Sequence, residues 1–111
     1  MTNSAVNFAK KTYNVKRWSE GYVDINAQGE LCVNPLKKAG AGSINLATLA
    51  EQLKEEGLTL PILVRFTDIL GHRASSLINA FANAKKEREY EGKYTAVYPI
   101  KVNQQFSVVE K

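Results

Sequence analysis

The stretch YTAVYPIKVNQQ, from Tyr94 to Gln105, decides how this chain is expected to fold. Its first residues alternate as a β-strand does, and nearly every residue from Ala96 to Ile100 is apolar, as in a strand that is covered on both faces. The apolar run stops at Lys101. A strand here therefore brings one amine to its carboxyl end, which is where α/β proteins usually carry out their chemistry.

Lys101 has two interpretations on the residues alone. Lysine commonly ends a strand because its ammonium group is solvated, and pattern alone favours this interpretation. The apolar strand in front of it supports the second interpretation, because desolvation favours the neutral amine that can attack a carbonyl carbon. Asn103 and Gln104 follow directly and could orient a cofactor bound at Lys101.

A second apolar run and a long amphipathic segment precede this stretch. Leu60 to Phe66 reads as a buried strand, and the next segment, to about Glu89, predicts a helix with one buried face, capped by Thr67 or Asp68. Strand, helix and strand in this order predict a βαβ unit with two parallel strands. A parallel sheet needs cover on both faces or closure into a barrel, so we expect an incomplete, amino-terminal piece of a larger α/β protein.

The amino-terminal third predicts a different kind of structure. Residues 1–12 are polar and are expected to be a flexible terminus. Residues 13–35 predict a β-hairpin, because two alternating runs, 21–25 and 30–33, flank the turn sequence NAQG at 26–29.

A linker and a helix are predicted next. Residues 36–45 are rich in Lys, Ala and Gly and read as a flexible connection. The Gly-Ala-Gly run at 40–42 is a weak phosphate-loop candidate, because the third glycine of the dinucleotide fingerprint and the P-loop lysine are both missing. The helix is expected from about residue 46 to 56, capped by Ser43 or Asn45.

Composition fits an ordinary globular protein of 111 residues, with 44% apolar and 23% charged residues. A net charge of +4 is too small and too scattered to predict nucleic-acid binding. Cys32 is the single cysteine, so no disulfide can form within the chain, and a reducing compartment is favoured. We find no secretory signal and no apolar run long enough to span a bilayer, and we therefore expect a cytoplasmic protein without a membrane partner.

The other candidate residues offer weaker chemistry. His72 is the single histidine and has neither a second histidine nor a suitably spaced carboxylate to complete a metal site. Arg65 and Asp68 flank the end of the first expected parallel strand, where an ion pair or a helix cap explains them. Cys32 is expected to be a buried structural thiol. Trp18 is expected to serve in packing or at an interface.

Three stretches resemble one enzyme family. They are LPILVRFTDILGHR at 60–73, YTAVYPIKVNQQ at 94–105 and, upstream, YNVKRWSEGYVDIN at 13–26. They resemble the biosynthetic arginine decarboxylases, pyridoxal-phosphate enzymes with an alanine-racemase-like (β/α)8 barrel and a β-rich domain. The resemblance implies that residues 46–111 are the first βα units of a truncated TIM barrel, and that the hairpin within 13–35 belongs to the β-rich domain.

The resemblance also implies a chemistry. Lys101 matches the lysine that holds pyridoxal 5′-phosphate as a Schiff base. The parent enzyme would convert L-arginine to agmatine and CO2 in polyamine (putrescine and spermidine) biosynthesis, with Mg2+ as a second cofactor and as a homo-oligomer, a dimer or a tetramer. In such enzymes the remaining catalytic groups lie beyond residue 111, so the isolated chain is expected to be inactive.

Two alternatives remain open. One is a small, non-enzymatic α/β module that binds an acidic partner and in which Lys101 is an ordinary surface lysine. The other is a pyridoxal-phosphate-binding barrel protein that has no decarboxylase activity.

Overall fold

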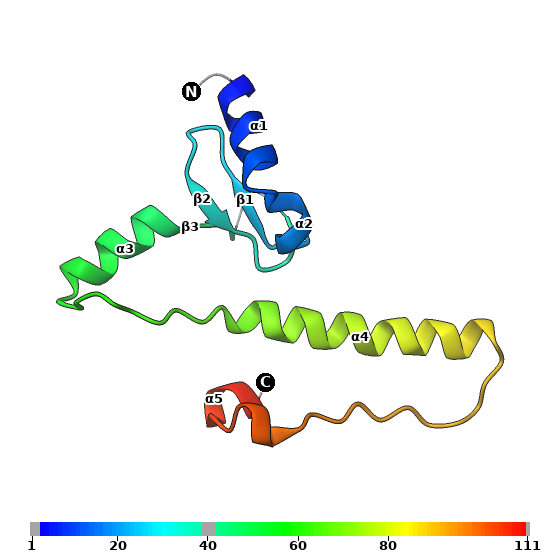
Figure 1. Cartoon of the computed structure of the whole chain (residues 1–111). Coiled ribbons are helices and arrows are strands. Elements are labelled where there is room, and N and C mark those ends of the chain that lie inside the picture. The colour runs from blue at the N-terminus through cyan, green and yellow to red at the C-terminus, as the bar shows by residue number, and fades with distance from the viewer. Residues whose placement is uncertain (1–2, 39–41, 111) are drawn as a thin grey trace. The chain divides into compact units, whose positions relative to one another are not determined.

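The structure, a computed structural model, describes residues 3–38 and 42–110 (Figure 1). The chain divides into two compact units, with the boundary between Arg65 and Phe66. Within these described ranges, the first unit contains three helices and a three-stranded sheet, and the second contains one long helix followed by two short helical segments. Part of the expected linker, residues 39–41, including most of its Gly-Ala-Gly run, lies outside the described residues.

Two helices open the first unit, α1 (Asn3–Thr12) and α2 (Val15–Ser19). Between them Asn14 adopts a left-handed backbone conformation, with φ of 51°, which interrupts the helix and changes the direction of the chain. The expectation of a flexible terminus at 1–12 therefore does not hold for residues 3–12, which are helical.

A small core explains why the start of the chain is helical. Val6 and Ala9 are three residues apart and so share one face of α1. Val6 is buried with Val15 of α2 and Ile25, and Ala9 packs against this cluster. Only Val6 and Ala9 of α1 take part in the cluster, which is too few positions to reveal a helical period in the sequence, so burial against the sheet determines this helix.

The two runs of the predicted hairpin pair as expected, whereas residues 15–19 of the predicted segment 13–35 form helix α2 instead. Strand β1 (Val23–Ile25) pairs antiparallel with β2 (Leu31–Val33), with Asp24 opposite Cys32. The side-chain oxygen of Asn26 accepts hydrogen bonds from the backbone N–H groups of Gln28 at 3.0 Å and Glu30 at 2.9 Å, which closes the turn. The side-chain bonds of Asn26 thus fix the register that alternation predicted.

A third strand lies inside the expected linker. β3 (Ile44–Asn45) pairs antiparallel with β2, so the sheet has the order β1, β2, β3. Ser43, directly before it, donates a hydrogen bond from its hydroxyl to the side-chain oxygen of Asn34 at 2.7 Å. A two-residue strand is too short to show alternation, which is why the sequence did not predict it.

Helix α3 (Leu46–Glu55) follows β3 directly and agrees with the prediction. The side-chain oxygen of Asn45 accepts from the backbone N–H groups of Ala47 at 2.9 Å and Thr48 at 3.2 Å, as an N-cap does. At the other end Gly57 has φ of +85°, and the N–H of Leu58 bonds to the carbonyl of Leu53 in a Schellman arrangement.

Replacing Asn45 by alanine is expected to destabilise the start of α3 by about 1 to 2 kcal/mol, because two backbone N–H groups lose their acceptor. The Asn45 amide also donates to a Glu30 carboxylate oxygen at 2.6 Å, and this bond is lost too. Hydrogen exchange at Ala47 and Thr48 measures the effect.

Asn83→Ala is the matched control, because Asn83 is exposed inside a helix and alanine is the better helix former. Equal protection of the α3 amides in Asn45→Ala and in the unsubstituted chain would contradict the capping role.

The second unit is built on helix α4 (Thr67–Glu87), close to the predicted span. Two expectations about it are wrong. Neither Thr67 nor Asp68 caps it: the N-cap position is Phe66, with no side-chain hydrogen bond. The apolar face is not buried either, since no residue of α4 is buried, because the described part of this unit has no sheet to cover that face.

The expected parallel strands are not formed. In the described residues the only sheet is that of β1, β2 and β3, and neither Leu60–Phe66 nor Tyr94–Lys101 belongs to it. A strand needs a neighbour to take up its backbone N–H and C=O groups, and neither segment finds one in the part of the chain that is described. Large apolar side chains on both segments are exposed: Leu60, Leu63, Val97 and Ile100.

Candidate functional site

Lys101 lies in η1 (Ile100–Val102), a single 3-10 turn in the second unit. Pro99 precedes the turn with an extended backbone, and its carbonyl accepts a hydrogen bond from the N–H of Val102 at 3.1 Å. Proline has no backbone N–H to donate between strands and its φ is fixed, so an extended segment tends to end at this point. Lys101 is therefore presented by a short turn that begins where the apolar run ends.

The side chain of Lys101 is exposed. Among the described residues no ion pair or side-chain hydrogen bond to its ammonium group is found. The expected partial desolvation by a covered strand is therefore not observed. The physical reason is the same as for the missing strands, since desolvation of Lys101 depends on layers packed on both faces of the segment before it.

Two contacts fix the backbone around Lys101. The Tyr98 hydroxyl donates to the carbonyl of Asn103 at 3.2 Å, which ties together the two sides of η1. The side-chain oxygen of Asn103 accepts from the N–H of Gln105 at 3.0 Å, directly before α5 (Phe106–Val109). Asn103, the candidate cofactor contact, thus uses its carbonyl oxygen in a local turn, while its amide nitrogen is left to donate.

The segment leading to Lys101 contacts α4 through an aromatic pair. The rings of Tyr94 and Phe81 are stacked, with centroids 4.1 Å apart and planes 9° from parallel. Tyr94 also lines a pocket of about 270 Å³ with three α4 residues, Ile78, Ala82 and Lys85. Lys101 does not line this pocket, so the pocket is not a binding site at the amine.

The remaining candidates are not brought together into a site. Cys32 is buried, as expected of a structural thiol. Arg65 and Asp68 are both exposed, and His72 is half-buried in the early turns of α4. Within the described ranges no group of three or more His, Cys, Asp or Glu residues could hold a metal ion, so the expected Mg2+ finds no support here.

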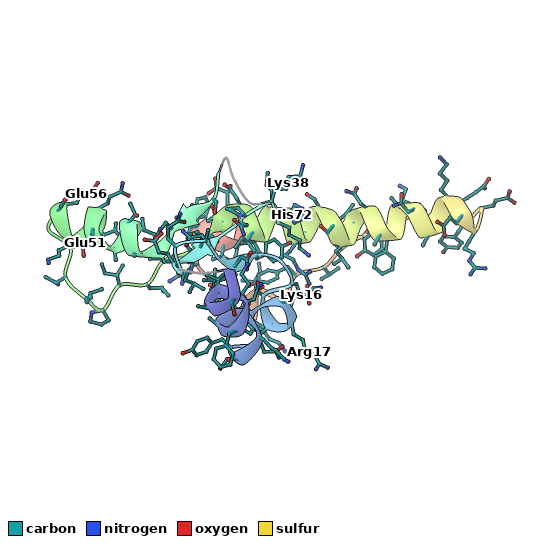
Figure 2. All side chains as sticks on the ribbon, turned by 90° about the horizontal axis from the view of Figure 1, so that it is seen from above. Lys16, Arg17, Lys38, Glu51, Glu56 and His72 are labelled. Atoms are coloured by element: carbon teal, nitrogen blue, oxygen red, sulfur yellow. The ribbon has the colours of Figure 1, made fainter. Side chains whose placement is uncertain are left out.

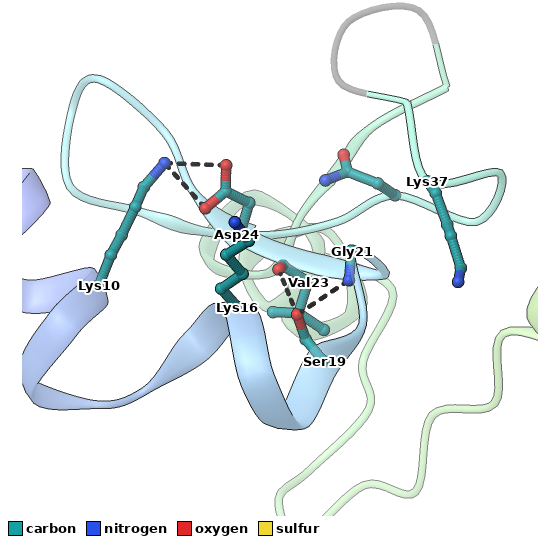
Figure 3. A pocket seen from close by; sticks show the side chains of 8 residues that line it. Lys10, Lys16, Ser19, Gly21, Val23, Asp24 and Lys37 are labelled. Atoms are coloured by element: carbon teal, nitrogen blue, oxygen red, sulfur yellow. Dashed lines mark hydrogen bonds and ion pairs between the residues drawn. The ribbon is translucent and has the colours of Figure 1, made fainter.

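A cluster that the sequence did not reveal lies in the first unit (Figure 3). It is a pocket of about 340 Å³, which we call the lysine pocket, lined by Lys10, Lys16, Ser19, Gly21, Val23, Asp24, Asn34 and Lys37. Lys10 forms an ion pair with Asp24 at 2.8 Å. These residues come from four parts of the chain, and no sequence motif connects them.

No helix in the described part of the chain has the length and apolar character that crossing a membrane requires.

Comparison with known proteins gives consistent results. No family model matches the chain. It is 49% identical over 111 residues to a biosynthetic arginine decarboxylase of Marinobacter nauticus, covering 100% of this chain and 17% of that protein. A protein of the same name from Aeromonas hydrophila is 46% identical over 110 residues, which cover 99% of this chain and 17% of that protein. Another, from Alkalilimnicola ehrlichii, is 43% identical over 111 residues, which cover 100% of this chain and 18% of that protein. The chain thus spans about a sixth of the length of these curated relatives.

Proposed function

We propose that this chain, similar along its whole length to biosynthetic arginine decarboxylases, is the amino-terminal part of such an enzyme, and that Lys101 is its attachment point for pyridoxal phosphate. The observation that carries the proposal is the 49% identity over all 111 residues to a protein of that name. An identity of this size without gaps in coverage supports a shared fold and a shared role for the corresponding segment.

The environment of Lys101 is compatible with the attachment of an aldehyde. Its Nζ is accessible on an exposed turn, and the Tyr98 hydroxyl and the Asn103 turn fix the backbone on both sides of it. Pyridoxal phosphate, when bound, withdraws electrons from the α-carbon of an attached amino acid so that its carboxylate can leave as CO2. Lys101 would hold the cofactor, and the Asn103 amide nitrogen is placed two residues away as a hydrogen-bond donor.

The missing strands are part of the same proposal. We assign residues 46–111 to the first βα units of a (β/α)8 barrel, in which Leu60–Phe66 and Tyr94–Lys101 become parallel strands once neighbouring strands are present. Their exposed apolar side chains support this assignment, because exposed apolar surface of this kind is normally buried against another part of the protein or a partner. The same cover would desolvate Lys101 and favour its neutral, reactive form.

The whole enzyme would take L-arginine to agmatine and CO2, in the direction of putrescine and spermidine. We propose a cytoplasmic homo-oligomer. This chain alone is expected to lack activity, because it supplies the lysine without a phosphate-binding loop or a group for the pyridine nitrogen.

Reductive labelling tests the proposal. The full-length protein is incubated with pyridoxal phosphate, reduced with borohydride and digested, and the labelled peptide is identified by mass spectrometry. We expect the label on Lys101, because borohydride fixes the carbon–nitrogen double bond between a lysine and the cofactor. Lys93 is the internal control, since it is also exposed and lies eight residues upstream.

The outcomes are distinguishable. Label on Lys101 together with release of CO2 from arginine supports the decarboxylase. Label on Lys101 without release of CO2 would instead indicate a cofactor-binding barrel with another activity. Equal label on Lys93 and Lys101 would show non-specific modification and would refute the assignment.

A further inference from the structure

The lysine pocket lies in the first unit, between the helices α1 and α2 and the first strand (Figure 3). None of its residues belongs to the Lys101 segment. Its volume of about 340 Å³ is within the range of small-molecule sites.

The charges in this pocket do not cancel. Lys10 Nζ lies 2.8 Å from both carboxylate oxygens of Asp24, so these two residues neutralise each other. Lys16 and Lys37 then leave two positive charges, and in the described part of the chain neither is found in an ion pair. Two excess positive charges around one hollow favour an anion.

Glu20, Glu51 and Glu56 do not line the pocket. Figure 2 shows Glu51 on α3 and Glu56 directly after it, away from Lys16. Glu20 follows α2 but does not line the pocket. Among the described residues that line the pocket, Asp24 is the one carboxylate.

Asn34 adds a neutral donor to this site. It is 4% exposed, and its side-chain oxygen accepts from the Ser43 hydroxyl at 2.7 Å. This bond fixes the orientation of the amide and leaves the NH2 group as the donor. In contrast, the Ser19 hydroxyl donates to the Val23 carbonyl at 2.9 Å and accepts from the Gly21 N–H at 3.3 Å, so it holds the wall of the pocket together.

The two lysines that form no ion pair among the described residues line the pocket from different sides. Figure 3 shows Lys16 and Lys37 on opposite sides of the turn that contains Ser19 and Gly21. The ammonium group of Lys37 lies 4.7 Å from the centroid of the Tyr22 ring, which restrains its position. A ligand that engages both lysines must therefore carry anionic groups at two places.

We propose that the lysine pocket binds a small ligand with two phosphate groups, one held by Lys16 and the other by Lys37, with the Asn34 amide as an additional donor. Lysine binds phosphate as a point charge with three donors, so it needs no bidentate geometry. Lys10 stays paired with Asp24 and shapes the site from the α1 side.

Titration of the full chain, labelled with nitrogen-15, with pyrophosphate tests this proposal. The backbone amides of Gly21 and Asn34 are expected to shift with saturable binding that weakens as salt is added. Lys16→Gln and Lys37→Gln should each weaken binding by about tenfold, the loss of one charge-assisted hydrogen bond. The controls Lys11→Gln and Lys38→Gln remove the same charge outside the pocket, five residues from Lys16 and one residue from Lys37 respectively. Each should change affinity by less than about twofold.

A third variant is expected to strengthen pyrophosphate binding instead of weakening it. Asp24→Asn releases Lys10 from its ion pair and should tighten pyrophosphate binding several-fold, as expected when a third positive charge faces the ligand. The hairpin amide spectrum reports whether each variant keeps its fold.

Several results would overturn the proposal. Equal weakening by the pocket variants and their controls would show diffuse charge attraction only. Inorganic phosphate binding as tightly as pyrophosphate would refute the two-group ligand, and succinate binding as tightly would refute the phosphate class. Unchanged or weaker binding in folded Asp24→Asn would refute the charge arrangement.

Discussion

If the full-length protein is the proposed arginine decarboxylase, Lys101→Ala in it is expected to lower kcat for arginine by about a thousandfold or more, the order of loss seen when a covalently acting side chain is removed. The expectation follows from the proposed role of Lys101, because alanine cannot hold the aldehyde of the cofactor. Release of labelled CO2 from arginine measures the activity, and borohydride labelling measures cofactor attachment independently.

Lys93→Ala is the control for this substitution, because it removes an exposed lysine of the same unit and should leave both measurements unchanged. Circular dichroism should be the same for both variants, since both side chains are exposed and substitutions of this kind change stability by less than about 0.5 kcal/mol. A Lys101→Ala enzyme that retains kcat within tenfold would refute the attachment role.

Val15→Ala is expected to destabilise the first unit by about 2 kcal/mol, the loss of two buried methyl groups plus part of the cavity that remains. Val15 is 2% exposed and belongs to the cluster that joins α1, α2 and β1 through Val6 and Ile25. The core is small, so this change is a large share of the stability of the unit. Hydrogen exchange of the β1–β2 amides should become roughly thirtyfold faster.

Val97→Ala makes the same chemical change at a side chain that is 85% exposed, in the second unit. It should alter stability by less than about 0.5 kcal/mol. If Val15→Ala left the hairpin amides as protected as Val97→Ala does, the cluster around Val15 would not be what holds α1 and α2 on the sheet.

Local chemistry determined which elements could be predicted from the sequence. The hairpin turn and α3 depend on neighbouring residues, such as Asn26 bonding to Gln28 and Asn45 bonding to Ala47, so both were predicted. α1 depends on burial of Val6 against residues far along the chain, and was missed.

The candidate site shows the same division. The Lys101 stretch was recognised because an apolar run ending in one lysine is a continuous pattern. Its expected strand and desolvation were not observed, since both depend on partners outside the segment rather than on its own residues. The lysine pocket could not be predicted, because Lys16 and Lys37 are brought to one hollow only by the fold.

A single carboxylate oxygen connects two of the predicted elements. Glu30 accepts hydrogen bonds at the same oxygen from the Asn26 amide at 2.8 Å and from the Asn45 amide at 2.6 Å. One of these asparagines closes the hairpin turn and the other caps α3. The hairpin turn and the first turn of α3 should therefore open and close as one cooperative unit, so that local unfolding of either one also destabilises the other.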